Sequence, residues 1–197
     1  MSVHQGEATR GANVIVPRSN TGSLALAGVA GLTLGLLANF ARKGVVQAPS
    51  VLAGRWDDAL AAEHRAALAL IDRIERTDGR QTTRRSIMLA QLKHALAKHS
   101  FQEENTVYAM LRLRGFGGPA AALNDEHGEV KRLLFELTEL PHDDPLWIDK
   151  VRELRAALEP HMRTEELDVF PRLRHELSDE ENRRLTLAMN KEGLKLA

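Results

Sequence analysis

Four long segments of the chain carry apolar residues three and four positions apart, and this spacing limits the possible folds more than any other feature. Side chains at these intervals lie on one face of an α-helix. Turn-forming residues separate the segments at 78–79, 115–119 and 141–145. No proline lies between Pro49 and Pro119, and no run alternates strictly between apolar and polar residues, as a half-buried strand would. The chain is therefore predicted to be all-α.

The breakers set the bounds of the predicted helices. These helices cover residues 53–77, 81–114, 120–140 and 146–175, and a further helix begins at Ser178. Ser178 and Glu181 have the spacing of a capping box, and Pro160 is expected to bend the fourth helix. Short loops between long antiparallel helices predict an up-and-down four-helix bundle over residues 51–177, with an extra C-terminal helix over 178–197.

The first 50 residues differ in composition from the rest of the chain. They hold seven of the fourteen glycines, and residues 24–41 form an uncharged apolar stretch that predicts a helix. Eighteen such residues are near the lower limit for crossing a bilayer. Two interpretations stay open for this helix: contact with a membrane, or packing against the bundle or another copy of the chain through Gly31 and Gly35. The predicted location is the cytoplasm, and the alternative is association with a membrane through residues 24–41.

The charge balance and the absence of cysteine exclude several classes of function. There are 27 basic and 27 acidic residues, so the formal net charge is zero, and nucleic acid is not an expected partner. Without cysteine there is no disulfide, thiolate zinc site, iron–sulfur cluster or cysteine nucleophile. Any metal ion must therefore be bound by nitrogen and oxygen atoms.

Polar residues interrupt all four apolar stripes. They are His64, His99, Glu103, His127, His161 and Glu165. Residues equidistant from a hairpin turn lie at the same level of two antiparallel helices, and the midpoint of His127 and His161 falls at 144, inside a predicted turn. The midpoints of the pairs His64–His99 and His99–His127 also fall close to the predicted turns between their helices. The six side chains are therefore expected in one layer, where a buried carboxylate is costly unless it is paired or bound to metal.

The same residues form an internal repeat. Glu63-His64 precedes His99 by 35 positions, and Glu126-His127 precedes His161 by 34, so the second half repeats the first. Two glutamates on opposing helices can bridge two ions. Imidazole and carboxylate ligands without thiolate suit iron first, with zinc and manganese as alternatives. Core histidines bonded to glutamates without metal are the other interpretation, and six groups in one layer favour metal.

At these residues the chain resembles the hemerythrin-like family, or HHE cation-binding domain, over about residues 56–177. The resemblance lies in the ordered set EH, HxxxEE, EH, HxxxEE. It implies a left-handed four-helix bundle with a non-haem di-iron centre. The implied terminal ligands are His64, His99, His127 and His161, and the implied bridging carboxylates are Glu103 and Glu165. Glu104 and Glu166 are not expected to bridge, because one further residue turns a side chain by about 100°.

The sequence departs from the oxygen-carrying members of the family at one position. These members have an additional histidine where this chain has Lys131, and a protonated lysine is a poor ligand. Lys131, Tyr108 and Asp168 are candidates for positions beside the ligands, although Lys131 could equally face solvent and Tyr108 could serve packing. The remaining histidines are expected at the surface: His4, His94, His142 and His175.

The resemblance implies a protein whose two iron ions react with dioxygen, hydrogen peroxide or nitric oxide, in a binding, sensing or storage role. The alternative is a di-iron enzyme that disposes of hydrogen peroxide, like a catalase or peroxidase. The sequence does not decide whether the protein is an enzyme, and it indicates no catalytic residue.

Overall fold

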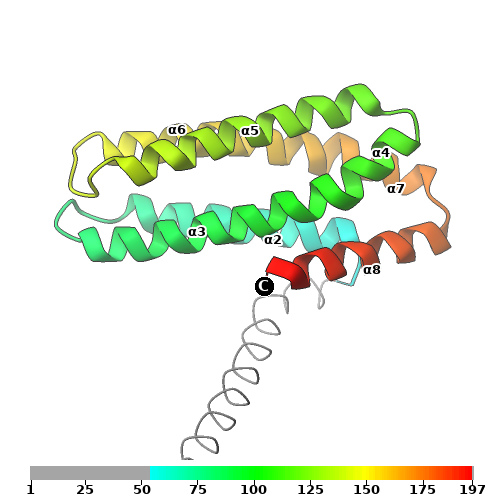
Figure 1. Ribbon diagram of the computed structural model, residues 1–197, viewed down its shortest axis with the longest axis horizontal. Coiled ribbons are helices and arrows are strands. Elements are labelled where there is room, and N and C mark those ends of the chain that lie inside the picture. The colour runs from blue at the N-terminus through cyan, green and yellow to red at the C-terminus, as the bar shows by residue number, and fades with distance from the viewer. Residues whose placement is uncertain (1–53, 197) are drawn as a thin grey trace, which may run out of the picture. The chain divides into compact units, whose positions relative to one another are not determined.

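A computed structural model describes residues 54–196, and this part of the chain is an all-helical bundle (Figure 1). No strand occurs between these two residues. The predicted segment 1–50, with its apolar helix over 24–41, lies outside the described residues. The fold class predicted from the apolar spacing is confirmed for residues 54–196.

Long helices lie side by side along one direction (Figure 1). In chain order, the elements are α2 (Trp56–Glu75), α3 (Thr82–Gln102), η1 (Glu103–Val107), α4 (Tyr108–Leu113), α5 (Gly117–Glu139), α6 (Trp147–Thr164), η2 (Glu165–Val169), α7 (Phe170–Glu176) and α8 (Asp179–Leu196). Helix α2 packs against α3 and α6, and α5 packs against α6 and α4. The turns fall at the predicted breakers, with Gly115 in the left-handed backbone region at φ 86°.

Two of the predicted helices are not continuous α-helices. Residues 81–114 are divided by the π-helical turn η1, and residues 146–175 are divided by η2. In each turn the backbone N–H five residues after a glutamate donates to its carbonyl, from Tyr108 to Glu103 and from Phe170 to Glu165. Short π-helical turns of this kind occur frequently at functional sites. Pro160 lies inside α6, which continues through it to Thr164.

The apolar interior consists of two clusters on either side of the predicted polar layer. The first cluster includes Ile71, Leu92 and Leu154, and the second includes Leu60, Leu111 and Leu173. Along the chain, each predicted histidine falls between residues of the two clusters. The layer is therefore enclosed by apolar side chains at both ends.

Helix α8 packs along the side of the bundle, against α2, α3 and η1, in the half that holds the second apolar cluster. Ser178 precedes this helix. The backbone N–H of Ser178 donates to Glu181 Oε2 at 2.9 Å, and the backbone N–H of Glu181 donates to Ser178 Oγ at 3.3 Å. This reciprocal pair confirms the predicted capping box. The indole N–H of Trp56 donates to Asn182 Oδ1 at 2.9 Å, and Met189 is fully buried. These contacts fasten α8 to α2 and to the second apolar cluster.

A buried arginine organises the opposite end. Arg85 on α3 donates to Thr77 Oγ1 at 2.8 Å and to the carbonyl of His142 at 2.5 Å, and its guanidinium lies 4.9 Å from the centre of the Trp147 ring. These bonds join the turn after α2 to the turn before α6. Both turns are thereby fixed at one level, which sets the register of the helices that carry the polar layer.

None of the helices within residues 54–196 combines the length and apolar character needed to cross a membrane.

Candidate metal centre

The structure brings the six predicted ligand residues together in one buried layer. His64 comes from α2, His99 from α3, His127 from α5 and His161 from α6. Glu103 and Glu165 are the first residues of η1 and η2, and both are fully buried. The Nε2 atoms of His64 and His99 are 2.9 Å apart, and those of His127 and His161 are 3.1 Å apart.

Each glutamate lies between imidazoles from different helices. Glu103 Oε2 is 3.1 Å from Nε2 of His99 and 3.3 Å from Nε2 of His127. Glu165 Oε2 is 3.3 Å from Nε2 of His64 and 3.3 Å from Nε2 of His161. Each carboxylate therefore touches both halves of the repeat, which is the arrangement expected of a bridging ligand.

We call the six predicted ligand residues the inner residues. Each inner histidine also contacts a second carboxylate, here called an outer carboxylate, through Nδ1, the ring nitrogen that faces away from the layer. Glu166 holds Nδ1 of His64 at 2.8 Å, Glu63 holds that of His99 at 3.1 Å, Glu104 holds that of His127 at 3.0 Å, and Glu126 holds that of His161 at 2.7 Å. An ionised carboxylate only accepts hydrogen bonds, so each Nδ1 carries the proton and donates it. In the neutral imidazole, Nε2 then keeps the lone pair that a metal ligand requires, directed into the layer.

Three of the four carboxylate oxygens of Glu103 and Glu165 lack a hydrogen-bond donor. Both carboxylate oxygens of Glu103 and Oε2 of Glu165 are buried without a hydrogen-bond partner. Buried charges of this kind are normally paired or bound to a metal ion. Two ligand atoms that each lie about 2.1 Å from one ion, with an angle of about 90° between the two bonds, are about 3 Å apart. The Nε2 atoms of His64 and His99, and those of His127 and His161, have this separation. The donor set and its spacing therefore fit a metal centre.

Within residues 54–196, the potential ligand atoms form two groups that share Glu103. One consists of His64, His99, Glu103 and Glu165, and the other of Glu103, His127 and His161. Two overlapping groups of nitrogen and oxygen ligands fit a pair of ions rather than a single one.

The carboxylates of the layer raise the pKa of two of its imidazoles, His99 and His127, when no metal neutralises them. Burial lowers the pKa of His99, but Glu103 and Glu63 outweigh it and raise that pKa well above 6.5. Burial raises the pKa of Glu63, but His99 and Lys98 lower it to about 2. Burial likewise raises the pKa of Glu103, but the surrounding imidazoles lower it well below 4.5. Glu63 and Glu103 therefore remain ionised, and a cation is needed beside them, either a proton or a metal ion.

Tyr108 lies at the site rather than only in the core. Its hydroxyl donates to Glu165 Oε1 at 2.6 Å and is 3.3 Å from Nε2 of His127, and its ring stacks on that imidazole. Burial and the neighbouring carboxylates raise the pKa of Tyr108 far above its usual value, so the hydroxyl keeps its proton. Phe170 occupies the corresponding place in the second half and stacks on His64.

Lys131 lies beside the site without contributing a nitrogen to the layer. Its ammonium group donates to Glu104 Oε1 at 2.8 Å, and its side chain is 58% exposed. It therefore contacts His127 only through Glu104. Asp168, which the sequence placed next to the ligands, lies on the surface instead, where it pairs with Arg172 at 2.7 Å. The wider π-helical turn η2 rotates this side chain away from the layer.

Sequence reasoning assigned no role to the four carboxylates that hold the Nδ1 atoms. The sequence indicates only that Glu104 and Glu166 are not expected to bridge and that Glu63 and Glu126 belong to the repeat. The signal was present in the motifs, since each EH and each HxxxEE contains one acidic residue beyond the ligands. Of the other histidines, His94 and His175 are exposed and His142 is half-buried in a turn, whereas His4 lies outside the described residues.

Comparison with known proteins agrees with this geometry. The family model described as the hemerythrin HHE cation-binding domain matches residues 57–173. The chain belongs to the hemerythrin family. The match runs from the first turn of α2 to α7, and it contains all six inner residues of the hemerythrin layer.

One curated relative of this hemerythrin domain is a DNA nickase from Nostoc sp., which is 33% identical over 91 residues. The aligned part covers 46% of this chain and 26% of the nickase, so the likeness concerns about a quarter of that protein. No solved structure matches the chain significantly.

Proposed function

We propose that this hemerythrin domain holds two iron ions within an up-and-down four-helix arrangement, with zinc and manganese as alternatives. Bound iron would supply redox chemistry toward dioxygen, hydrogen peroxide or nitric oxide, in a binding, sensing or storage role. The observation that supports the proposal is the pair of buried carboxylates, Glu103 and Glu165, three of whose four oxygens lack a hydrogen-bond donor although they lie among four imidazole nitrogens. His64, His99, His127 and His161 would be the terminal ligands, and the two glutamates would bridge.

Metal analysis of the purified protein tests this proposal. We expect about two iron ions per chain, and His99→Ala should lose most of the metal, because the remaining ligands leave a buried carboxylate uncompensated. His175→Ala, an exposed histidine on α7, is the matched control and should keep full occupancy. Full occupancy in a variant that lacks both Glu103 and Glu165 would contradict the assignment.

Disposal of hydrogen peroxide is the second candidate function, and one observation favours it. The ion beside His127 and His161 would lack the additional protein ligand of the oxygen-carrying members, because the nitrogen of Lys131 is bonded to Glu104. A site with fewer protein ligands leaves more room for a small reactant. We expect the iron-loaded protein to consume hydrogen peroxide, and Lys131→His to slow this consumption. No measurable consumption by the wild-type protein would favour the binding role.

DNA cleavage, which the name of the Nostoc relative raises, is not part of the proposed function. Binding of the phosphate backbone relies on clustered lysine and arginine, and this chain has a formal net charge of zero. We expect no nicking of supercoiled plasmid by the metal-loaded protein. Metal-dependent nicking that disappears in His99→Ala would reverse this conclusion.

We propose a cytoplasmic location, and residues 24–41 would mediate either membrane contact or self-association. Fractionation without detergent separates the two, because a membrane-bound form sediments with lipid and a self-associated form stays in the supernatant.

A further inference from the structure

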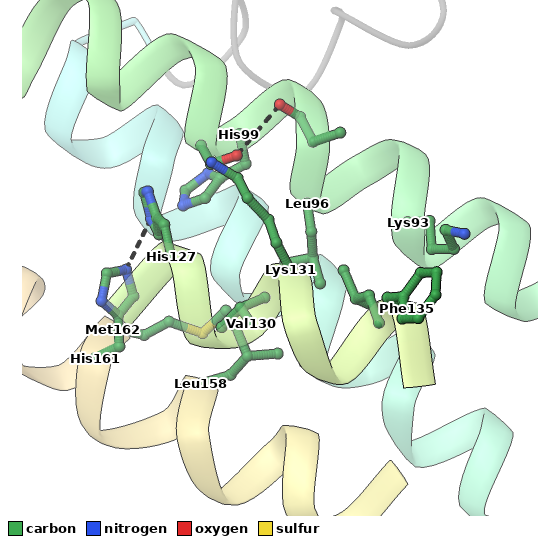
Figure 2. Close-up of a pocket in the computed structure, with 13 residues that line it drawn as sticks. Lys93, Leu96, His99, His127, Val130, Lys131, Phe135, Leu158, His161 and Met162 are labelled. Carbon is green, nitrogen blue, oxygen red and sulfur yellow. Dashed lines mark hydrogen bonds between the residues drawn. The ribbon is translucent and has the colours of Figure 1, made fainter. Parts of the chain in front are cut away.

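A cavity of about 240 Å³ lies between α3 and α5 and ends at the metal layer. His99, His127 and His161 lie at one end of it, and Lys93 and Phe135 lie at the other (Figure 2). Its volume corresponds to about eight molecules of liquid water at about 30 Å³ each. A diatomic gas or hydrogen peroxide would fill only a small part of this space.

The wall of the cavity is aliphatic between its two ends. The side chains that form it are Leu96, Val130, Leu134, Leu158 and Met162, and Figure 2 shows four of them, Leu134 being unlabelled, between the histidines and Phe135. An apolar wall of this kind gains free energy by burying hydrocarbon. Six residues of α3 separate Lys93 from His99, a rise of about 9 Å, so the cavity is elongated enough for an alkyl chain of medium length.

The two lysines that line the cavity differ in their partners. Lys131 is paired with the carboxylate of Glu104. Lys93 donates to the hydroxyl of Thr138 at 2.8 Å, and within residues 54–196 it forms no ion pair. The ammonium group of Lys93 therefore keeps a positive charge that no carboxylate of this region neutralises. An anionic group would be attracted to this end of the cavity.

We propose that the cavity binds an aliphatic monocarboxylate of medium chain length, with its carboxylate at Lys93 and its alkyl chain directed toward the histidines. The inference goes beyond the proposed function, because it does not depend on which metal the layer holds. It assigns to the protein an organic ligand whose chain end lies beside the metal centre.

Calorimetric titration of the full-length, metal-loaded protein with octanoate tests this binding site. We expect one saturable site per chain, and the dissociation constant should fall about fourfold for each methylene added from butanoate to octanoate. Octylamine has the same chain with the opposite charge and should bind about tenfold more weakly or worse. Equal affinity for octanoate and octylamine would overturn the proposal, as would the absence of binding at millimolar octanoate.

Matched variants test the orientation of the ligand. Lys93→Met should weaken octanoate binding by about tenfold or more and leave octanol binding unchanged. Lys131→Met, at the other end of the cavity, should change octanoate binding less than about twofold, because Lys131 is paired with Glu104. The opposite ranking of the two variants would overturn the assigned orientation. Ala97→Phe, at an exposed position that lines the cavity, should block octanoate without altering the core.

Metal content measured on the same samples separates this inference from the proposed function. A protein with two iron ions and no octanoate site contradicts the cavity proposal alone. A protein that binds octanoate and holds no iron contradicts the metal assignment alone.

Discussion

Each inner histidine uses its two ring nitrogens differently, and the outer carboxylates determine which nitrogen carries the proton. A carboxylate at Nδ1 fixes the tautomer, orients the ring and increases the basicity of Nε2. Glu63, Glu104, Glu126 and Glu166 provide this contact for the four rings. We therefore expect the affinity for metal to depend on ten side chains rather than six.

Replacing an outer carboxylate should weaken metal binding without removing a ligand. We expect Glu166→Gln to lower the affinity for iron by about 10- to 100-fold, because the amide is a weaker acceptor for Nδ1–H of His64. Competition with a chromophoric chelator measures this change. Asp168→Asn is the control two residues away, on an exposed side chain paired with Arg172, and it should leave the affinity unchanged. An equal effect of both variants would contradict the role of Glu166.

Removing the hydroxyl of Tyr108 should destabilise the metal-free protein. Tyr108→Phe leaves Oε1 of Glu165 buried without a donor, a loss of about 1–3 kcal/mol in the free energy of unfolding. Urea unfolding in the presence of a chelator measures this quantity. An unchanged free energy would mean that Glu165 finds another donor.

The sequence predicted the inner residues because they lie on the apolar stripes, where a polar side chain is conspicuous. It did not predict the outer carboxylates, because Glu104 and Glu166 lie one position off the stripe and resemble ordinary surface residues. Their partners are also distant in sequence, since 102 positions separate His64 from Glu166. Only the packing of the halves brings them together.

At the scale of the elements, both buried glutamates of the layer, Glu103 and Glu165, start a π-helical turn. Each turn accommodates one more residue than an α-helical turn, so the ligand and the apolar residues after it can both face the interior. Glu103 faces the layer, and Tyr108 and Leu111 are still buried after η1. The π-helical turns thus correct the helical phase between the metal layer and the second apolar cluster.

Shortening η1 by one residue should disrupt this phase. We expect deletion of the exposed Asn105 to convert the turn to α-helix and rotate the following residues by about 100°, which takes Tyr108 and Leu111 away from the core. The helical signal in circular dichroism and the metal content should both fall. Asn105→Ala keeps the length and should preserve both properties. Retention of full metal content by the deletion variant would show that the turn does not set the phase.

The helices themselves were predictable from the apolar spacing and the breakers, with ends within a few residues of those observed. The π-helical turns were not, because the pattern that they share, Glu-Glu-x-x-Val, is equally compatible with an ordinary α-helix. Pro171 lacks a backbone donor and lies just after η2, but Ala109 occupies the corresponding place after η1. The turns follow from the competing demands of ligand and core positions, which appear only when the helices pack.

At the scale of the whole molecule, residues 54–196 contain both apolar clusters and every inner and outer side chain of the metal layer. Removing residues 1–50 should therefore leave a folded bundle that retains its metal. Thermal unfolding and metal analysis of the truncated and full-length proteins measure this. Loss of iron on truncation would show that the first 50 residues contribute to the core.

The cross-connections between outer carboxylates and inner histidines also bear on the ancestry of the chain. Each half of the repeat forms one helical hairpin. Glu63 contacts His99 within the first hairpin, and Glu126 contacts His161 within the second. The other two contacts, Glu166 with His64 and Glu104 with His127, join one hairpin to the other. Two identical hairpins related by a two-fold axis would make all of these contacts, because each residue of one copy then meets the same partner residue in the other copy. The chain therefore has the construction expected of a duplicated and joined hairpin. Tyr108 opposite Phe170 is a point at which the halves have since diverged.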